Sequence, residues 1–176
     1  MALRPALFPV ARAATASETQ AVETGGPAPE AVFTTAEGRE RRLSEFKGHP
    51  VLLWLFATWC PSCASGTASV ARYFDTLRAG GLQIIQLELY RNLGYPGPSV
   101  EQIAKDNAGR IYPSAHWLFG DASKETSFLY DPKGVPDLYF LIDADGILRH
   151  VGWTPSATMG DILAFARRRG SPAKRK

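Results

Sequence analysis

Two cysteines separated by two residues are the part of this sequence best suited to chemistry. They are Cys60 and Cys63, the only cysteines among the 176 residues. This spacing lets the second thiol reach back to the first within one helical turn, so that the pair can open and close as a disulfide. At a helix N-terminus, unpaired N–H groups and the helix dipole favour a thiolate, which is the nucleophilic form of a thiol. We therefore expect Cys60 to attack and Cys63 to resolve.

The residues around the pair predict the elements that position it. Residues 51–56 (VLLWLF) do not alternate between polar and apolar, which favours a strand buried on both faces. After the cysteines, apolar residues recur at helical spacing and the pattern ends at Gly80-Gly81. Pro61 fits the first turn of this helix, where a missing N–H costs little. The sequence therefore places Cys60 at the junction of a buried strand and a helix.

The rest of the chain predicts a single α/β domain. A parallel strand follows the cysteine helix, and the chain closes with a hairpin and a last helix. The expected strands are 31–35, 40–43, 82–90, a short strand ending near 119, 137–143 and 147–153. The further helices are 99–109, a short helix from Asp121 or Ser123 through Tyr130, and 155–170, with Thr154 as a cap and Pro155 at its first position.

The two ends of the chain differ in composition from this domain. Residues 1–29 lack periodicity and are interpreted as a leader or linker, residues 30–170 as the domain, and residues 171–176 as a disordered basic tail. The net charge is +3, but residues 167–176 hold six basic side chains, and without these the net charge is −3. We therefore expect no nucleic-acid partner. Residues 1–16 weakly resemble a signal peptide, and the sequence leaves membrane anchoring open.

A metal site and two inert structural cysteines are the alternatives for a lone pair of cysteines. Zinc usually takes four protein ligands, or three and a water molecule. The sequence has no second CxxC, and His49, His116 and His150 are scattered without ligand spacing. We therefore expect a redox-active disulfide that needs no metal and no organic cofactor.

The segment FATWCPSC resembles the active site of the thioredoxin superfamily, and the wider pattern resembles its TlpA/ResA-type thiol-disulfide oxidoreductases. The matching pieces are residues 44–48, 50–63, 134–136 and 141–146. The resemblance implies a thioredoxin-like fold, with a central mixed β-sheet flanked by helices, an N-terminal hairpin and a central insert within 91–130. It also implies exchange with protein dithiols and disulfides, more often as a reductant. We expect a monomer. The resemblance favours an extracytoplasmic role, in the periplasm or cell envelope, such as reducing apocytochrome cysteines, and a cytoplasmic location stays open as the alternative.

The resemblance implies further site residues. The superfamily has a cis-proline at the position of Pro136, packed against the CxxC, and the backbone of the residue before it, here Val135, pairs with an extended substrate segment. Within the motif itself, Ser62 can donate a hydrogen bond to the Cys60 thiolate. Trp59 is expected to shield one side of the disulfide, and a purely structural role for this aromatic residue stays open.

Two departures from the family affect the proton of the buried thiol. Many thioredoxins carry a carboxylate six residues before the first cysteine, where this chain has Trp54. TlpA/ResA-type proteins often have Glu three residues after the second cysteine, where this chain has Gly66. Glu88, at the carboxyl end of the strand 82–90, is a hypothetical substitute as proton acceptor. The alternative is that Glu88 simply faces solvent.

Two other functions remain as alternatives. A peroxiredoxin-type peroxidase shares the fold but carries Thr three residues before the attacking cysteine. This chain has Ala57 at that position, and Thr58 is the next residue. A Sco-like copper-binding module spaces its cysteines CxxxC and adds a histidine, for which His116 is the only nearby choice.

Overall fold

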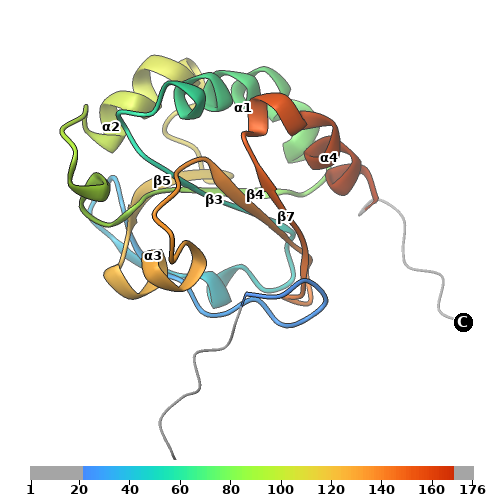
Figure 1. Ribbon diagram of the computed structural model, residues 1–176. Coiled ribbons are helices and arrows are strands. Elements are labelled where there is room, and N and C mark those ends of the chain that lie inside the picture. The colour runs from blue at the N-terminus through green and yellow to red at the C-terminus, as the bar shows by residue number, and fades with distance from the viewer. Residues whose placement is uncertain (1–21, 169–176) are drawn as a thin grey trace, which may run out of the picture.

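A mixed sheet of seven strands forms the centre of the computed structural model, which describes residues 22–168 (Figure 1). The strand order is β2-β1-β5-β4-β3-β6-β7. The strands are β1 (Val32–Thr35), β2 (Glu40–Arg42), β3 (Val51–Phe56), β4 (Gln83–Glu88), β5 (Trp117–Ala122), β6 (Leu138–Ile142) and β7 (Leu148–Trp153). The helices are η1 (Leu43–Phe46), α1 (Pro61–Ala79), η2 (Tyr90–Gly94), α2 (Val100–Ile103), η3 (Ala104–Ala108), η4 (Gly109–Ile111), α3 (Lys124–Tyr130) and α4 (Pro155–Arg168).

Strand β3 lies inside the sheet and carries the chain to the cysteines. It pairs in parallel with β4 on one side and antiparallel with β6 on the other. Leu52, Trp54 and Phe56 pack into the core beneath α1, while Leu53 and Leu55 pack into the core on the opposite face. All six residues of β3 are buried. The prediction of a strand covered on both faces is therefore confirmed.

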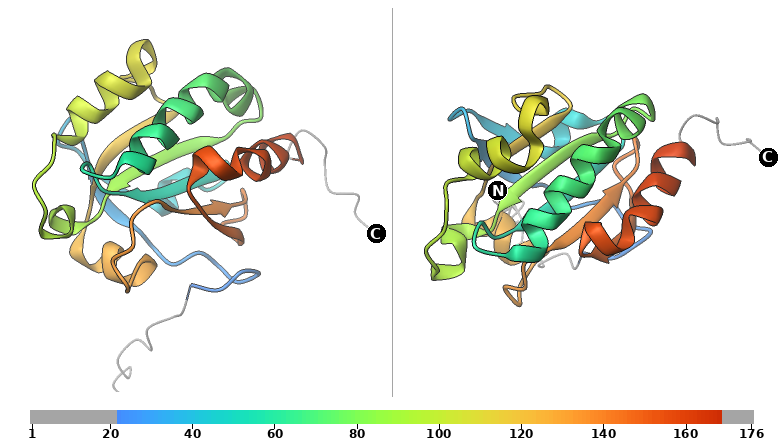
Figure 2. Two further views of the ribbon diagram at one scale, coloured as in Figure 1. Left: turned by 45° about the horizontal axis from the view of Figure 1, so that its top comes forward. Right: turned by 90° about the horizontal axis from the view of Figure 1, so that it is seen from above.

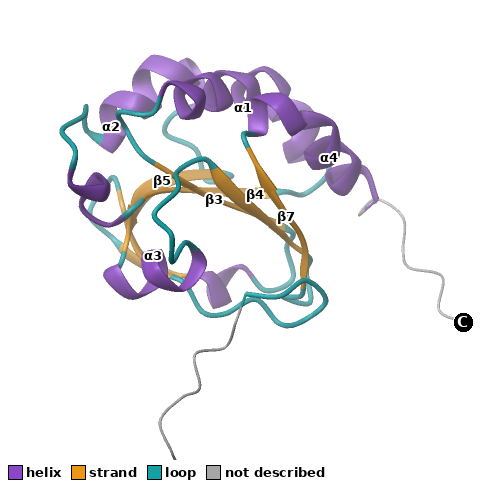
Figure 3. Cartoon of the chain, in the orientation of Figure 1, coloured by secondary structure: helices purple, strands orange, loops and turns teal. Residues whose placement is uncertain are grey.

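Helices cover both faces of the sheet (Figure 2). Helices α1, α2 and α4 lie over one face, and α1 packs directly against α4 (Figure 3). Helix α3 and the short η1 lie on the other face. This arrangement confirms the predicted α/β fold with its N-terminal hairpin, which β1 and β2 form as antiparallel partners.

The predicted helices are confirmed with changes at their ends. Helix α1 starts at Pro61 and ends before Gly80, as the sequence indicates. The helix expected at 99–109 is α2 followed by the π-helical turn η3. Ser123 caps α3 by accepting a hydrogen bond from the Thr126 N–H. The predicted end of α4 at Gly170 lies outside the described residues.

The predicted linker ends earlier than residue 29. The N–H of Gly25 donates to the carbonyl of Leu148 (2.8 Å), and the N–H of Leu148 donates to Gly26 (2.9 Å). Ala28 donates in the same way to Gly146 (2.8 Å). Residues 25–28 are therefore part of the folded domain, because their backbone pairs with the start of β7. The rest of the predicted leader and the basic tail lie in residues 1–21 and 169–176, which the structure does not describe.

Within residues 22–168, no helix combines the length and the apolar character that a membrane span requires.

Candidate active site

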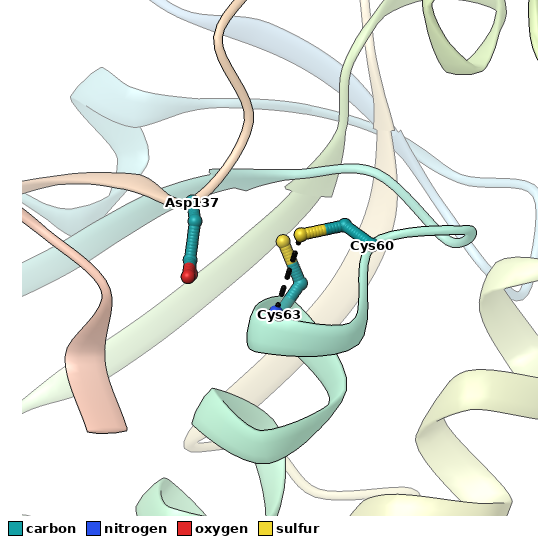
Figure 4. Close-up of side chains that lie close together, drawn as sticks. All are labelled: Cys60, Cys63 and Asp137. Atoms are coloured by element: carbon teal, nitrogen blue, oxygen red, sulfur yellow. Dashed lines mark hydrogen bonds between the residues drawn. The ribbon is translucent and has the colours of Figure 1, made fainter. Parts of the chain in front are cut away.

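The two cysteines lie at the N-terminus of α1, directly after β3 (Figure 4). Cys60 is the N-cap residue, and its Sγ accepts a hydrogen bond from the backbone N–H of Cys63 at 3.3 Å. This N–H is one of the groups that a helix leaves unpaired at its start. The position of Cys60 thus follows from the helix boundary that the sequence predicted.

The two thiols have different surroundings. Cys60 is 6% exposed and Cys63 is 1% exposed. Ser62 Oγ lies 3.2 Å from Cys60 Sγ, so Cys60 has a second hydrogen-bonding neighbour besides the Cys63 N–H. Burial raises the pKa of the Cys63 thiol far above its usual range, and contact with Cys60 and the charge of Asp137 add to the rise. Cys63 is therefore held as a neutral thiol, which agrees with the predicted role of a resolving cysteine.

Asp137 completes the group around the cysteines and was missed by the sequence analysis. Its carboxylate and the two sulfurs lie within 4.8 Å of one another (Figure 4). Oδ1 accepts a hydrogen bond from the indole Nε1–H of Trp54 at 3.1 Å. Oδ2 is buried and has no hydrogen-bond partner among the described residues. A carboxylate therefore lies beside the buried thiol. It comes from the segment that leads into β6, and not from position 54, position 66 or Glu88.

The Val135–Pro136 peptide bond is trans, so the prediction of a cis bond there is wrong. Among the described residues, the cis bond is Tyr112–Pro113. The chain enters β6 through Asp137 instead, whose φ of 78° is in the left-handed region. The Asp137 N–H donates to the carbonyl of Leu55 (3.0 Å), and its carbonyl accepts from Thr154 (2.8 Å). The turn is thus made at Asp137, where the backbone is fixed on both sides, and does not need a cis bond at Pro136.

Val135 and Pro136 lie in the loop that leads to Asp137. Val135 is exposed and Pro136 is partly buried. Burial raises the pKa of the Asp131 carboxyl group, and the backbone N–H groups of Val135, Gly134 and Lys133 in this loop offset part of the rise. The exposed side of the loop leaves Val135 accessible, and its role in binding substrate stays a prediction.

Trp54 explains both departures from the thioredoxin pattern. Its ring lies over the start of α1, where a Cβ on Gly66 would come within 2.7 Å of Trp54 Cη2. A side chain at position 66 is therefore excluded by the Trp54 ring. The indole N–H of the same ring donates a hydrogen bond to Asp137 Oδ1. One side chain, Trp54, thus replaces the first usual carboxylate, leaves no room for the second at position 66, and donates a hydrogen bond to Asp137.

Asn92 fixes the segment that precedes Cys60. Its side chain accepts a hydrogen bond from the Thr58 N–H (2.9 Å) and donates to Thr58 Oγ1 (2.8 Å). The Asn92 carbonyl accepts from the indole N–H of Trp59 (2.9 Å). Trp59 is 36% exposed and packs edge-on against Tyr95, with ring centroids 5.1 Å apart. Trp59 therefore lies beside the cysteine pair at the surface, held by a loop that the sequence analysis did not connect to the site.

Glu88 lies at the carboxyl end of β4 as predicted, but it pairs with Asp121 on β5. The two residues are opposite each other in the parallel ladder. Burial, together with the charge and hydrogen bond of Asp121, raises the pKa of Glu88 to about 7. Glu88 is not among the groups that act on the Cys63 thiol, whereas Asp137 is.

The described residues give no support to a copper site of the predicted composition. His116 directly precedes β5, whereas Cys60 follows β3, and both strands run parallel to β4. His116 is thus at the opposite edge of the sheet, where its Nδ1 lies 3.1 Å from Gln83 Nε2. Cys60, Cys63 and Asp137 are the one group of three or more potential metal-binding side chains within residues 22–168. The prediction that the site works without a metal stays a prediction.

Comparison with known proteins identifies the family of this chain. The profile of the AhpC/TSA family matches residues 24–151, and the chain belongs to this family. It is 30% identical over 146 residues to the thiol-disulfide oxidoreductase ResA of Geobacillus kaustophilus, covering 83% of this chain and 78% of that protein. It is also 30% identical over 132 residues to the thiol:disulfide interchange protein DsbE of Vibrio cholerae, covering 69% and 60%.

Solved structures show the same fold. A thiol:disulfide interchange protein of the thioredoxin family from Chlorobium tepidum is similar with a TM-score of 0.61 and 23% identity, covering 80% of this chain and 95% of the other. A thiol:disulfide interchange protein from a Bacteroides species is similar with a TM-score of 0.63 and 16% identity, covering 87% and 93%. With its close Cys60–Cys63 pair in a thioredoxin-like fold, the chain is a thiol-disulfide oxidoreductase of the ResA type.

Proposed function

We propose that this protein reduces disulfides in partner proteins, with Cys60 as the attacking residue and Cys63 as the resolving residue. Cys60 attacks one sulfur of the partner disulfide and forms a mixed disulfide. Cys63 then attacks Cys60, which releases the reduced partner and leaves the Cys60–Cys63 disulfide. Another dithiol protein resets the pair. All these steps use side chains of one chain, so a monomer is sufficient.

The asymmetry of the cysteine pair is the observation that carries this proposal. Two groups, the Cys63 N–H and the Ser62 hydroxyl, are placed to stabilise negative charge on Cys60 Sγ. Cys63 lies deeper, and its raised pKa keeps it protonated. In such a pair, the thiolate of one cysteine can attack the partner disulfide while the other cysteine stays protonated until the mixed disulfide forms. This asymmetry suits disulfide exchange in two steps.

The groups around the pair act on the direction of exchange in opposite senses. The Asp137 carboxylate disfavours negative charge on Cys63, whereas the Cys63 N–H and the Ser62 hydroxyl stabilise a Cys60 thiolate and so favour the reduced form of the pair. The reducing direction in this proposal therefore follows the resemblance to TlpA/ResA-type proteins, and the reduction potential of the pair tests it.

Single cysteine variants test the order of attack, with insulin as a model protein disulfide. Cys63→Ser is expected to accumulate a covalent adduct with insulin that a reducing agent releases. Cys60→Ser is expected to form no adduct and to lose catalysis of insulin reduction by dithiothreitol. An adduct that forms through Cys63 in the Cys60→Ser variant, at the rate of the unmodified protein, would reverse the proposed roles.

Peroxide reduction is the second candidate, because the AhpC/TSA profile matches most of the chain. In the structure, the Thr58 hydroxyl accepts a hydrogen bond from Asn92, and Ala57 offers no hydroxyl. The position at which a peroxiredoxin-type site carries its threonine hydroxyl therefore has none in this chain. We expect negligible consumption of hydrogen peroxide by the reduced protein under conditions in which insulin is reduced.

A further inference from the structure

We propose that Asp137 is a catalytic residue that accepts the proton of Cys63 in the resolving step. This inference rests on the proposed function and names the base that this chain uses. Its basis is the position of the carboxylate, which lies within 4.8 Å of both sulfurs and is itself buried.

The two carboxylate oxygens of Asp137 are in different situations. Oδ1 is occupied by the Trp54 indole N–H. Oδ2 is buried without a hydrogen-bond partner among the described residues. A buried carboxylate oxygen with no donor is unfavourable, and it is a ready acceptor for a nearby proton. The proton available at this place is that of the Cys63 thiol.

The resolving step then balances as follows. The Cys63 S–H bond breaks, and its proton passes to the Asp137 carboxylate. The Cys63 sulfur attacks Cys60 Sγ, so that the Cys60–Cys63 bond forms and the bond between Cys60 and the partner breaks. The electron pair of the broken bond leaves on the partner sulfur, which takes up a proton. The partner disulfide has gained two electrons in all, and the cysteine pair has lost them.

The structure fixes the carboxylate from several sides. The backbone of Asp137 is hydrogen-bonded to Leu55 on β3 and to Thr154 before α4. Trp54 holds Oδ1, and its ring has room because residue 66 is glycine. Within the described residues, the titratable groups that act on the Cys63 thiol are Cys60 and Asp137. Both elements packed here, β3 and the start of α1, present no other charged side chain to the thiol.

Asp137→Asn separates proton transfer from the first attack. The probe is the chromogenic disulfide dithiobis(nitrobenzoate), which releases one coloured thiolate when Cys60 attacks and a second when Cys63 resolves. We expect the second release to slow at least about tenfold near neutral pH, since general base catalysis contributes about 10²–10⁴-fold. The first release is expected to stay within about threefold, because Cys60 keeps its hydrogen-bonding neighbours.

A second readout excludes a merely structural effect. In a Cys60→Ser background, the pH dependence of Cys63 alkylation reports the pKa of this thiol. Removing the Asp137 charge is expected to shift alkylation to lower pH. A thiol that becomes more acidic and yet resolves more slowly is the signature of a lost base. Misfolding would not produce this combination.

Glu88→Gln serves as the matched control, because it neutralises another half-buried carboxyl group that the structure pairs with Asp121. It is expected to leave both releases unchanged. If Asp137→Asn fails to fold, Trp54→Phe tests the same carboxylate, because it removes the N–H that orients Oδ1 while keeping an aromatic ring. This variant is expected to slow the second release selectively.

Two results would overturn the assignment of Asp137. One is a second release that is as fast in Asp137→Asn, or in Trp54→Phe if the first variant cannot be folded, as in the unmodified protein. The other is a loss of the second release in Glu88→Gln alone. Absence of the first release in the unmodified protein would instead contradict the proposed function.

Discussion

At the scale of single side chains, Trp54 is the residue that distinguishes this site from the usual thioredoxin pattern. Its ring covers Gly66 and its indole N–H holds Asp137, so one side chain decides where a carboxylate can and cannot lie. A carboxylate on β3 or at position 66 would occupy space that the ring fills. The acceptor is therefore on the segment that faces the cysteines across the site.

Gly66→Ala tests this packing. The added Cβ would lie 2.7 Å from Trp54 Cη2, closer than packed atoms tolerate. Overpacking of this kind costs about 1–3 kcal/mol in the free energy of unfolding, and we expect a loss in that range by urea denaturation.

Gly160→Ala on α4 is the control, because a Cβ there meets nothing within 4 Å. Replacing a helical glycine by alanine is expected to stabilise the protein by roughly 0.5–1 kcal/mol. Equal effects of the two substitutions would contradict the close contact between Gly66 and Trp54.

The residues that do the chemistry could be predicted in part. The types and spacing of Cys60 and Cys63 indicated the pair and its position at a helix start. Asp137 was assigned to the beginning of a strand, because a lone Asp after Val-Pro carries no local signal of a site. The signal lay elsewhere: Trp54 and Gly66 removed both usual carboxylates, and Asp137 was the acidic residue next to the expected Pro136. Only tertiary structure shows that it faces the thiols.

At the scale of elements, the loop between β4 and α2 is the support of the CxxC segment. Its turn η2 has positive φ at Arg91, Asn92 and Leu93, a conformation that non-glycine residues rarely adopt. Asn92 accepts hydrogen bonds from the Thr58 N–H and the Trp59 indole N–H and donates one to Thr58 Oγ1, and these bonds hold the turn in place. The loop therefore couples the end of β4 to the segment that carries Cys60.

Asn92→Ala is expected to destabilise the protein by about 2–3 kcal/mol in urea denaturation, since a buried Thr58 N–H loses its partner and alanine is strained at positive φ. Trp59 fluorescence is expected to shift to longer wavelength as the segment loosens.

Asn107→Ala provides the comparison, because Asn107 donates a single hydrogen bond to the Ile103 carbonyl within a helical segment. Its expected cost is below about 1.5 kcal/mol. A loss in Asn92→Ala no larger than in Asn107→Ala would argue against the supporting role of the loop.

The elements themselves were largely predictable from the sequence. The apolar run of β3, the helical spacing of α1 and the turn before β7 are local patterns, and the structure confirms all three. The left-handed turn η2 could not be predicted, because its conformation is stabilised by contacts with Thr58 and Trp59 and not by its own residues. The same reason applies to Asp137, whose backbone is fixed by Leu55 and Thr154.

At the scale of the whole molecule, the sheet gathers ionisable groups along the carboxyl edge of its parallel strands. Cys60 follows β3, Glu88 ends β4 and Asp121 lies near the end of β5. Burial raises the pKa of both carboxyl groups, and that of Glu88 reaches about 7. The pair is therefore expected to make the stability of the fold depend on pH.

The sign follows from the direction of the shift. The pKa of Glu88 is about 7 in the folded protein against its ordinary value of 4.5, so the folded state binds more protons between these values. Stability is then greatest below about pH 4.5 for this group and falls until about pH 7. After screening of the half-exposed pair by solvent, we expect a fall of about 1–2 kcal/mol. Urea denaturation across this range measures it.

Glu88→Gln is expected to remove most of this fall while leaving the remaining pH dependence in place. A pH profile that is the same in the variant and in the unmodified protein would contradict the raised pKa of Glu88 in the folded protein.

The reduction potential of the Cys60–Cys63 pair tests the central claim most directly. Trp59 lies beside the pair, so its fluorescence in defined thiol buffers can follow the exchange. We expect a reversible two-electron transition with a midpoint of about −270 mV, the range of thioredoxin-like reductants. A midpoint above about −180 mV would mark an oxidant or isomerase, and no reversible transition at all would contradict thiol-disulfide exchange at this site.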